Sequence, residues 1–260
     1  MRNLVRGASL LTVCVVVVAC ANAVPPSRID QYLTFDQPAA PESLLKAEQR
    51  PSTAGLVLVP DQVDQTAPAV LPEEALVRLG DTLKQDIARV LPVTMTEVFS
   101  AEGVRPRDQG GDLSRVVDLA KSKGLDYLAV VVVSSTEQEY PVTLFLGATT
   151  HAQPGYRRDN WSLLEFVLLD VKSGKAVMQA EGRGWATLDR PTAPGINQWY
   201  PVVYLRPQDP NRPIWPPTYE GAPNTLRVVS FEQAEKRLVL KLQNSWLGQL
   251  EADAAARRSS

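Results

Sequence analysis

Few side chains in this sequence can do nucleophilic or metal chemistry. The 260 residues contain one histidine, His151, and two cysteines, Cys14 and Cys20. A serine nucleophile needs a base, but His151 lies in a polar Thr-Thr-His-Ala-Gln stretch typical of a solvated loop, and there is no Gly-x-Ser-x-Gly motif. Glycine motifs for phosphate binding are also missing, and so few Cys and His cannot build a zinc ribbon or a disulfide framework. We therefore expect no cofactor and no metal.

Two carboxylates remain as candidates for catalysis. Glycoside hydrolysis needs a pair of them about 5–10 Å apart, and Glu165 and Asp170 both lie in a predicted strand. Asp170 adjoins a turn, where aspartate commonly accepts backbone hydrogen bonds, and Glu165 alternates as an outward residue of the strand. Structural roles are favoured for both, so the sequence predicts a protein that is not an enzyme. An enzyme acting on glycan or peptide is the alternative.

The N-terminus has the pattern of an export signal that ends in a cysteine. Arg2 and Arg6 precede an apolar run, Ala8 to Val18, that is too short to span a bilayer stably, and Val17-Val18-Ala19-Cys20 follows. This ending resembles the lipobox of bacterial lipoproteins, in which the peptide is cut before the cysteine and the cysteine is acylated. The resemblance implies a signal peptide over 1–19, a lipid on Cys20 that binds the membrane, and an outer-membrane location facing the periplasm. An uncleaved anchor with an incidental cysteine is the alternative.

A proline- and aromatic-rich segment, 190–224, is the candidate for binding a partner. Trp, Tyr and Arg dominate interface hot spots, and the predicted partner-binding residues are Trp199, Tyr200, Tyr204, Arg206, Arg212, Trp215 and Tyr219. The segment either folds back as a lid over the sheet or forms an exposed docking loop for another envelope protein or a glycan. The near balance of 27 Lys and Arg with 29 Asp and Glu gives no basic excess, so no nucleic-acid partner is expected.

The remaining pattern predicts one α/β (α+β) domain. We expect a lipidated tether over 20–54, with a local helical turn near 29–33, followed by a layered domain over 55–256 that contains the 190–224 insertion. Strands are predicted at 55–59, 93–99, 126–135, 162–171 and 175–188, with an edge strand near 142–146 and loop around His151, Pro154 and Gly155. Helices are predicted from Pro72 to Pro92, from Asp112 to Gly124, and from a capping box at Ser230 to about 254. The order β-α-β-α-β-(β)-β-β-α indicates a mixed sheet of about five or six strands with helices packed on it.

Two short stretches carry a further resemblance. They are Gly124-Leu125-Asp126-Tyr127-Leu128 before an apolar strand, and Asp170-Val171-Lys172-Ser173-Gly174-Lys175 between strands. Both resemble bacterial envelope lipoproteins such as the curli-secretion-channel lipoprotein, the lipoprotein activators of peptidoglycan synthases and the N-terminal domain of the Tol-Pal translocation protein. The overall layout is similar to the rhombotarget lipoproteins. The resemblance implies a non-enzymatic outer-membrane lipoprotein that binds or positions other envelope components, with a periplasmic cell-wall enzyme and a subunit of an oligomeric channel as the alternatives.

Overall fold

The computed structural model describes residues 25–33, 52–61, 70–110, 113–145, 152–192, 200–201 and 222–259. Its helices and 3₁₀ turns are η1 (Ile29–Gln31), α3 (Glu73–Val90), η2 (Arg107–Gln109), α4 (Ser114–Ser122) and α5 (Ala222–Ser259). Its strands are β1 (Ser52–Pro60), β2 (Val93–Phe99), β3 (Tyr127–Phe145), β4 (Ala152–Asp170), β5 (Ala176–Pro191) and β6 (Tyr200–Pro201).

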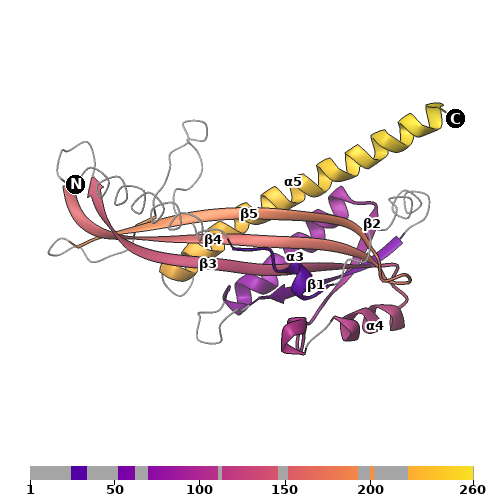
Figure 1. Ribbon diagram of the computed structural model, residues 1–260, viewed down its shortest axis with the longest axis horizontal. Helices are drawn as coiled ribbons and strands as arrows, with labels where there is room; N and C mark the ends of the chain where they lie inside the picture. Colours follow the sequence, from indigo (N-terminus) through magenta and orange to yellow (C-terminus); the bar gives the residue numbers. More distant parts are fainter. Residues whose placement is uncertain are drawn as a thin grey trace, which may run out of the picture.

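The strands form one mixed sheet in the order β2-β1-β3-β4-β5-β6. β1 pairs in parallel with both β2 and β3, whereas β3, β4, β5 and β6 pair antiparallel in sequence. Two crossover helices precede the parallel strands, as parallel pairing requires, and the long antiparallel strands make the molecule elongated (Figure 1). The predicted α+β class and mixed sheet are confirmed.

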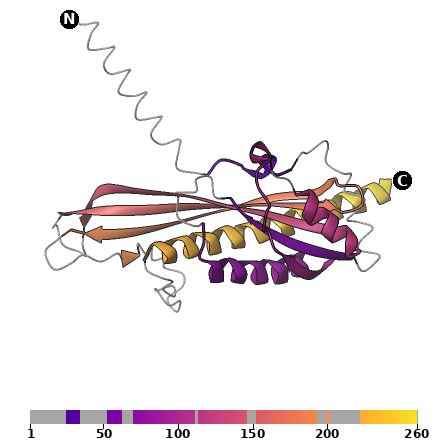
Figure 2. The same cartoon turned by 90° about the horizontal axis from the view of Figure 1, so that it is seen from below.

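Helices cover the two faces of the sheet unequally. α3 and α5 lie together on one face (Figure 2), where Leu83, Ile87, Phe231 and Leu238 pack against side chains of β1, β3 and β4. On the other face, the buried side chains of β1 and β3 pack against the short helix α4 and against the segment around η1. The first face therefore has two long helices for cover, and the second has one helix of nine residues.

The early elements match the sequence prediction. α3 begins after Pro72, which fits the first turn of a helix because its missing N–H is not needed there. β2 has its predicted bounds. Gly124 follows the end of α4, Gly174 lies in the turn between β4 and β5, and each has a positive φ angle of 69°. Left-handed backbone of this kind favours glycine. The N-cap position of α4 is Leu113, and Asp112, where this helix was predicted to begin, lies outside the described residues.

The later boundaries differ from the prediction. β3 continues without a break through the predicted edge strand, and Pro154 and Gly155 belong to β4 rather than to a loop. The distal halves of these strands are joined by cross-strand ion pairs instead of an apolar core: Arg158 contacts Glu139, and Arg190 approaches the same carboxylate at 3.5 Å. His151 lies outside the described residues.

The helix at the C-terminus begins earlier than the capping box indicated. α5 starts at Ala222, so Ser230 is inside the helix and is not its N-cap. The Ser230 hydroxyl is buried and donates to the Arg227 carbonyl at 2.8 Å, while Asn160 of β4 donates to Ser230. The serine therefore connects the helix to the sheet through a buried polar contact.

Two glycines of β5 let α5 lie directly on the strand. A Cβ atom at Gly182 would come within 2.0 Å of the Ala234 carbonyl oxygen, and one at Gly184 within 1.7 Å of the Ser230 carbonyl oxygen. Both obstacles are helix backbone, which cannot move without shifting α5. Glycines inside a strand are typical of a bulge or of a close approach by another backbone, and Gly182 and Gly184 here mark a close approach.

A side chain at Gly184 should destabilise the fold. We expect Gly184→Ala to lower the free energy of unfolding by about 1–3 kcal/mol, because overpacking forces the helix off the strand. Gly248→Ala is the matched control: Gly248 lies in α5 with no atom within 4 Å of its added Cβ, so alanine should be neutral or stabilising. Urea denaturation of both variants checks this, and equal midpoints would contradict the proposed close packing.

Candidate functional site

The residues Pro25–Leu33, here called the strap, pack against the sheet. The strap contains the single 3₁₀ turn η1, and Tyr32 is buried at 3% exposure. Ile29 and Leu33 contact the apolar cluster on the α4 face of the sheet, which includes Val130 and Val167. The helical turn predicted near 29–33 is confirmed, and it docks on the domain although it lies in the stretch interpreted as a tether.

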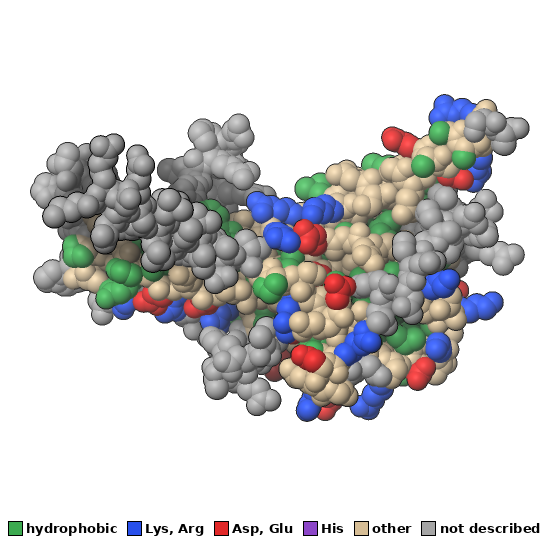
Figure 3. All heavy atoms as spheres, in the orientation of Figure 1, with side chains coloured by type: hydrophobic (Ala, Val, Ile, Leu, Met, Phe, Trp, Pro, Cys, Tyr) green, Lys and Arg blue, Asp and Glu red, His purple; other side chains and the backbone are tan. Residues whose placement is uncertain are grey.

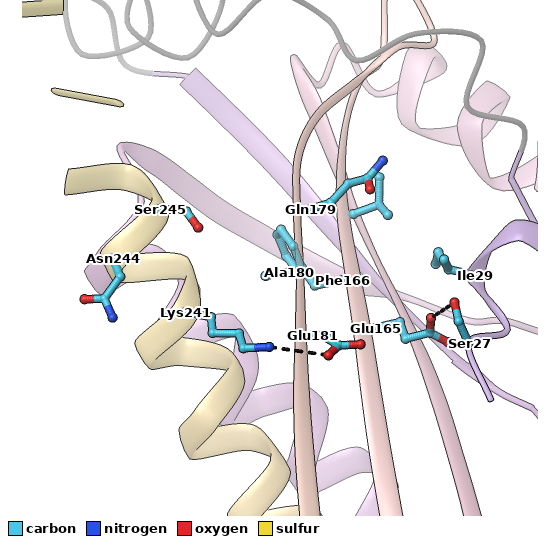
Figure 4. Close-up of a pocket in the computed structure, with 11 residues that line it drawn as sticks. Ser27, Ile29, Glu165, Phe166, Gln179, Ala180, Glu181, Lys241, Asn244 and Ser245 are labelled. Atoms are coloured by element: carbon cyan, nitrogen blue, oxygen red, sulfur yellow. Dashed lines mark hydrogen bonds and ion pairs between the residues drawn. The ribbon is translucent and has the colours of Figure 1, made fainter. Parts of the chain in front are cut away.

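Glu165 of β4 fastens the first residues of the strap. Its carboxylate accepts a hydrogen bond from the Ser27 hydroxyl (Figure 4). It also accepts one from the backbone N–H of Arg28, at 2.7 Å. The N–H groups at the start of a helical turn have no partner within the turn, so the carboxylate satisfies donors that burial would otherwise leave unpaired. Glu165 is only 4% exposed, which corrects the prediction that it points outward to solvent.

Asp61, just after β1, fastens the other end of the strap. It is 3% exposed, and it accepts from the Arg28 guanidinium at 2.6 Å and from the Tyr32 hydroxyl at 2.7 Å. Burial and the hydrogen bond to Asp61 raise the pKa of Tyr32 well above its usual range. The two buried carboxylates, Glu165 and Asp61, thus hold the strap at both ends.

A cavity of about 490 Å³ lies beside the strap, along β5 and below α5. Figure 4 shows Lys241 reaching from α5 toward Glu181 of β5, and these side chains form an ion pair at 3.4 Å. Figure 3 shows basic side chains gathered with an acidic one where α5 crosses β5; Arg237 of α5 also donates to the Arg183 carbonyl at 2.7 Å there. The cavity is therefore bordered by charged groups that already have partners.

The cavity brings together a carboxylate pair that the sequence analysis did not identify. Glu165 and Glu181 lie opposite each other in the register of β4 and β5, and directly opposite residues have Cβ atoms about 4.5–5.5 Å apart. Burial raises the pKa of Glu165, whereas the hydrogen bond from Arg183 lowers that of Glu181. Divergent pKa values are typical of an acid–base pair. Here, however, both oxygens of Glu165 accept hydrogen bonds from the strap, and Arg183 and Lys241 bind Glu181.

Glu165 and Asp170, the candidate carboxylates of the alternative enzyme hypothesis, are not brought together. Asp170 follows Glu165 by five positions on β4, which places their side chains on opposite faces and roughly 17 Å apart along the strand. Asp170 accepts the backbone N–H of Ser173 at 2.7 Å, the turn role expected for it. A polar residue inside the apolar run Leu-Leu-Glu-Phe-Val was the signal that Glu165 has a buried partner, but nothing in the sequence indicates that the partner is the strap.

Most residues of the predicted binding sites lie outside the described part of the chain. Tyr200 begins β6 and pairs with Asp189 of β5. The others are Cys20, Trp199, Tyr204, Arg206, Arg212, Trp215 and Tyr219. Their predicted roles in lipidation and partner binding therefore stay predictions.

Two further properties concern the described residues alone. In the described ranges, no group of three or more His, Cys, Asp or Glu side chains is placed to hold a metal ion. Among the helices of that same part of the chain, none combines the length and the apolar character needed to cross a membrane.

Comparison with known proteins gives fold-level similarity at most. No family model and no curated protein matches the chain. Similar solved structures include the LpoB C-terminal domain from Salmonella enterica, at 16% identity over 55% of this chain and 90% of that one, with a TM-score of 0.29. Lipoprotein GNA1162 from Neisseria meningitidis matches at 13% identity over 52% and 83%, with a TM-score of 0.27.

A protein from Caulobacter crescentus described as a lipoprotein matches at 13% identity over 84% of this chain and 98% of that one, with a TM-score of 0.25. The similar structures thus include bacterial lipoproteins. TM-scores this low do not establish a shared overall fold, so the function proposed below rests on this chain's own residues.

Removing the Glu165 carboxylate should release the strap. In Glu165→Ala, the Arg28 amide loses a charge-assisted hydrogen bond worth about 1.5–3 kcal/mol. Hydrogen exchange at the strap amides should therefore accelerate about ten-fold or more, as measured by mass spectrometry. Glu97→Gln, which breaks only the exposed pair with Lys123, is the control and should leave strap exchange unchanged. Unchanged exchange in Glu165→Ala would contradict the role assigned to this carboxylate.

Proposed function

We propose that this protein is a non-enzymatic lipoprotein of the outer membrane, anchored by acyl chains on Cys20 and facing the periplasm, that binds or positions other envelope components. The observation that carries the proposal is the strap, because it fixes the domain only a few residues from the proposed lipid anchor. A chain that needed a long free spacer would gain nothing from two buried carboxylates that bind its first described residues.

The strap limits how far the domain can stand from the membrane. Pro25 follows Cys20 by five positions, which corresponds to a span of at most about 18 Å. If the strap were free, the 32 residues from Cys20 to Ser52 could extend to about 110 Å. A docked strap therefore keeps the sheet next to the bilayer, where the protein would meet membrane-associated partners.

The non-enzymatic part of the proposal rests on how the carboxylates beside the strap cavity are used. The best-placed pair, Glu165 and Glu181, has its oxygens engaged by the strap, Arg183 and Lys241. A general acid and a nucleophile need lone pairs and protons directed at a substrate. Partner binding is assigned instead to the 190–224 segment, whose start is held to β5 by β6.

Lipidation depends on the thiol of Cys20. Wild type should sediment with outer membranes and take up an alkynyl palmitate analogue, because two or more acyl chains anchor a protein stably. Cys20→Ser should lose the label and either stay as precursor or become soluble in the periplasm. Cys14→Ser is the matched control and should behave as wild type. Label on Cys20→Ser, or wild type that is soluble and unlabelled, would refute the anchor.

Partner binding should depend on the aromatic residues of the 190–224 segment. Chemical cross-linking in cells followed by purification should recover envelope proteins with wild type, and the double variant Trp199→Ala, Trp215→Ala should lose most of them, since such anchors each contribute about 2 kcal/mol or more. Asn211→Ala in the same segment is the control. Identical partner sets for the double variant and wild type would exclude this segment as the docking site.

A further inference from the structure

A small cavity lies between α3 and α5, on the face of the sheet away from the strap. It encloses about 220 Å³, and its apolar lining consists of the buried residues Leu71, Ala75, Leu79, Val228 and Phe231. Sites for drug-sized ligands measure about 300–1,000 Å³. The α3–α5 cavity is therefore closer to the size of a single long side chain.

One ionisable side chain, Glu235 of α5, lines this cavity and is nearly buried. It is 8% exposed, and within the described part of the chain its Oε1 atom has no hydrogen-bond partner. This distinguishes it from Glu165, which is buried to a similar degree but accepts hydrogen bonds on both oxygens. A buried carboxylate without a partner is costly, so such a group calls for an explanation.

The charged groups around Glu235 do not neutralise it. Asp86 of α3 and Glu232 of α5 add negative charge, while Lys236 of α5 and Arg78 of α3 lie at the exposed rim of the cavity. Asp86 is paired with Arg89 at 2.8 Å. Burial, followed by the two acidic neighbours, raises the pKa of Glu235 to about 7. The cavity thus combines an apolar wall with one buried carboxylate, Glu235, while the other charged residues that line it, Arg78, Glu232 and Lys236, are exposed at its rim.

We propose that the α3–α5 cavity binds a lysine or arginine side chain of a partner protein, with Glu235 as the counter-ion. The charge of a basic side chain complements the carboxylate, and its methylene stem matches the apolar wall, since long basic side chains bury their stems along apolar surface. Residues 62–69, which precede the cavity residue Leu71 in the sequence, contain no Lys or Arg. This contact is separate from the 190–224 segment and does not depend on lipidation.

The test uses n-butylammonium as a probe for the lysine side chain. Methyl NMR of the full chain in non-ionic detergent follows Leu71, Leu79 and Val228 during titration with n-butylammonium or with neutral n-butanol. We expect saturable binding of the cation in the millimolar range and at least ten-fold weaker binding of the alcohol. Glu235→Gln should weaken cation binding at least ten-fold, whereas the rim control Glu232→Gln should change it less than two-fold.

A second measurement needs no variant. Glu235 must be ionised to bind the cation, so affinity should be at least ten-fold higher at pH 8 than at pH 5.5, on either side of its pKa of about 7. Equal binding of cation and alcohol, or an affinity independent of both pH and Glu235→Gln, would overturn the proposal. A ten-fold gain in probe affinity in the double variant Arg206→Ala, Arg212→Ala would overturn it too, since the occupant would then be this chain's own arginine.

Discussion

The structure depends on covering both faces of a sheet whose two central strands, β1 and β3, are apolar on both faces over residues 56–59 and 128–133. In β1, Leu56 and Leu58 face one cluster while Val57 and Val59 face the other, and all four are nearly fully buried. Strands of this kind must have a layer on each side. α3 and α5 supply one layer, but α4 has only nine residues and leaves part of the second face to be covered by the strap. The strap is therefore part of the core and not a spacer.

This covering role explains the polar groups at the strap. A 3₁₀ turn laid on an apolar sheet brings backbone N–H groups with it, and these need acceptors once water is excluded. Glu165 supplies them from the middle of β4, and Asp61 supplies acceptors for Arg28 and Tyr32 from the end of β1. Each carboxylate is tolerated in the interior because its hydrogen bonds replace those it made to water.

The sequence predicted the elements whose periodicity comes from an apolar face. α3, β2 and α4 were identified because their inward residues recur at regular spacing. The distal parts of β3 and β4 were not identified, because there the strands are joined by pairs such as Arg158 with Glu139, and Pro154 and Gly155 resemble loop. The local sequence pattern around Arg158 does not indicate its partner Glu139, which lies 19 residues away. Ser230 is a second example: its local sequence predicted a capping box, whereas its hydroxyl contacts Asn160, 70 residues away.

The sequence indicated only part of the candidate site, because the partners of its residues are also distant in the chain. Glu165 stood out as an acid inside an apolar run, yet its partners come from the strap, 137 residues earlier in the chain. Glu235, by contrast, was hidden in the helical pattern of α5, where a glutamate is unremarkable. Its burial comes from α3, which packs beside it.

The two buried glutamates, Glu165 and Glu235, also differ in whether the fold explains their burial. The hydrogen bonds of Glu165 are complete within the chain, so its burial is accounted for by the fold. Glu235 has no such account: an apolar residue of similar volume at this position would pack against Phe231 and Leu79 without a desolvation cost. A fold that keeps a buried carboxylate oxygen without a partner beside an open cavity sacrifices stability there, and such exceptions to local consistency are expected at functional sites. The face with α3 and α5 is thus as much a candidate for recognition as the strap side is for attachment.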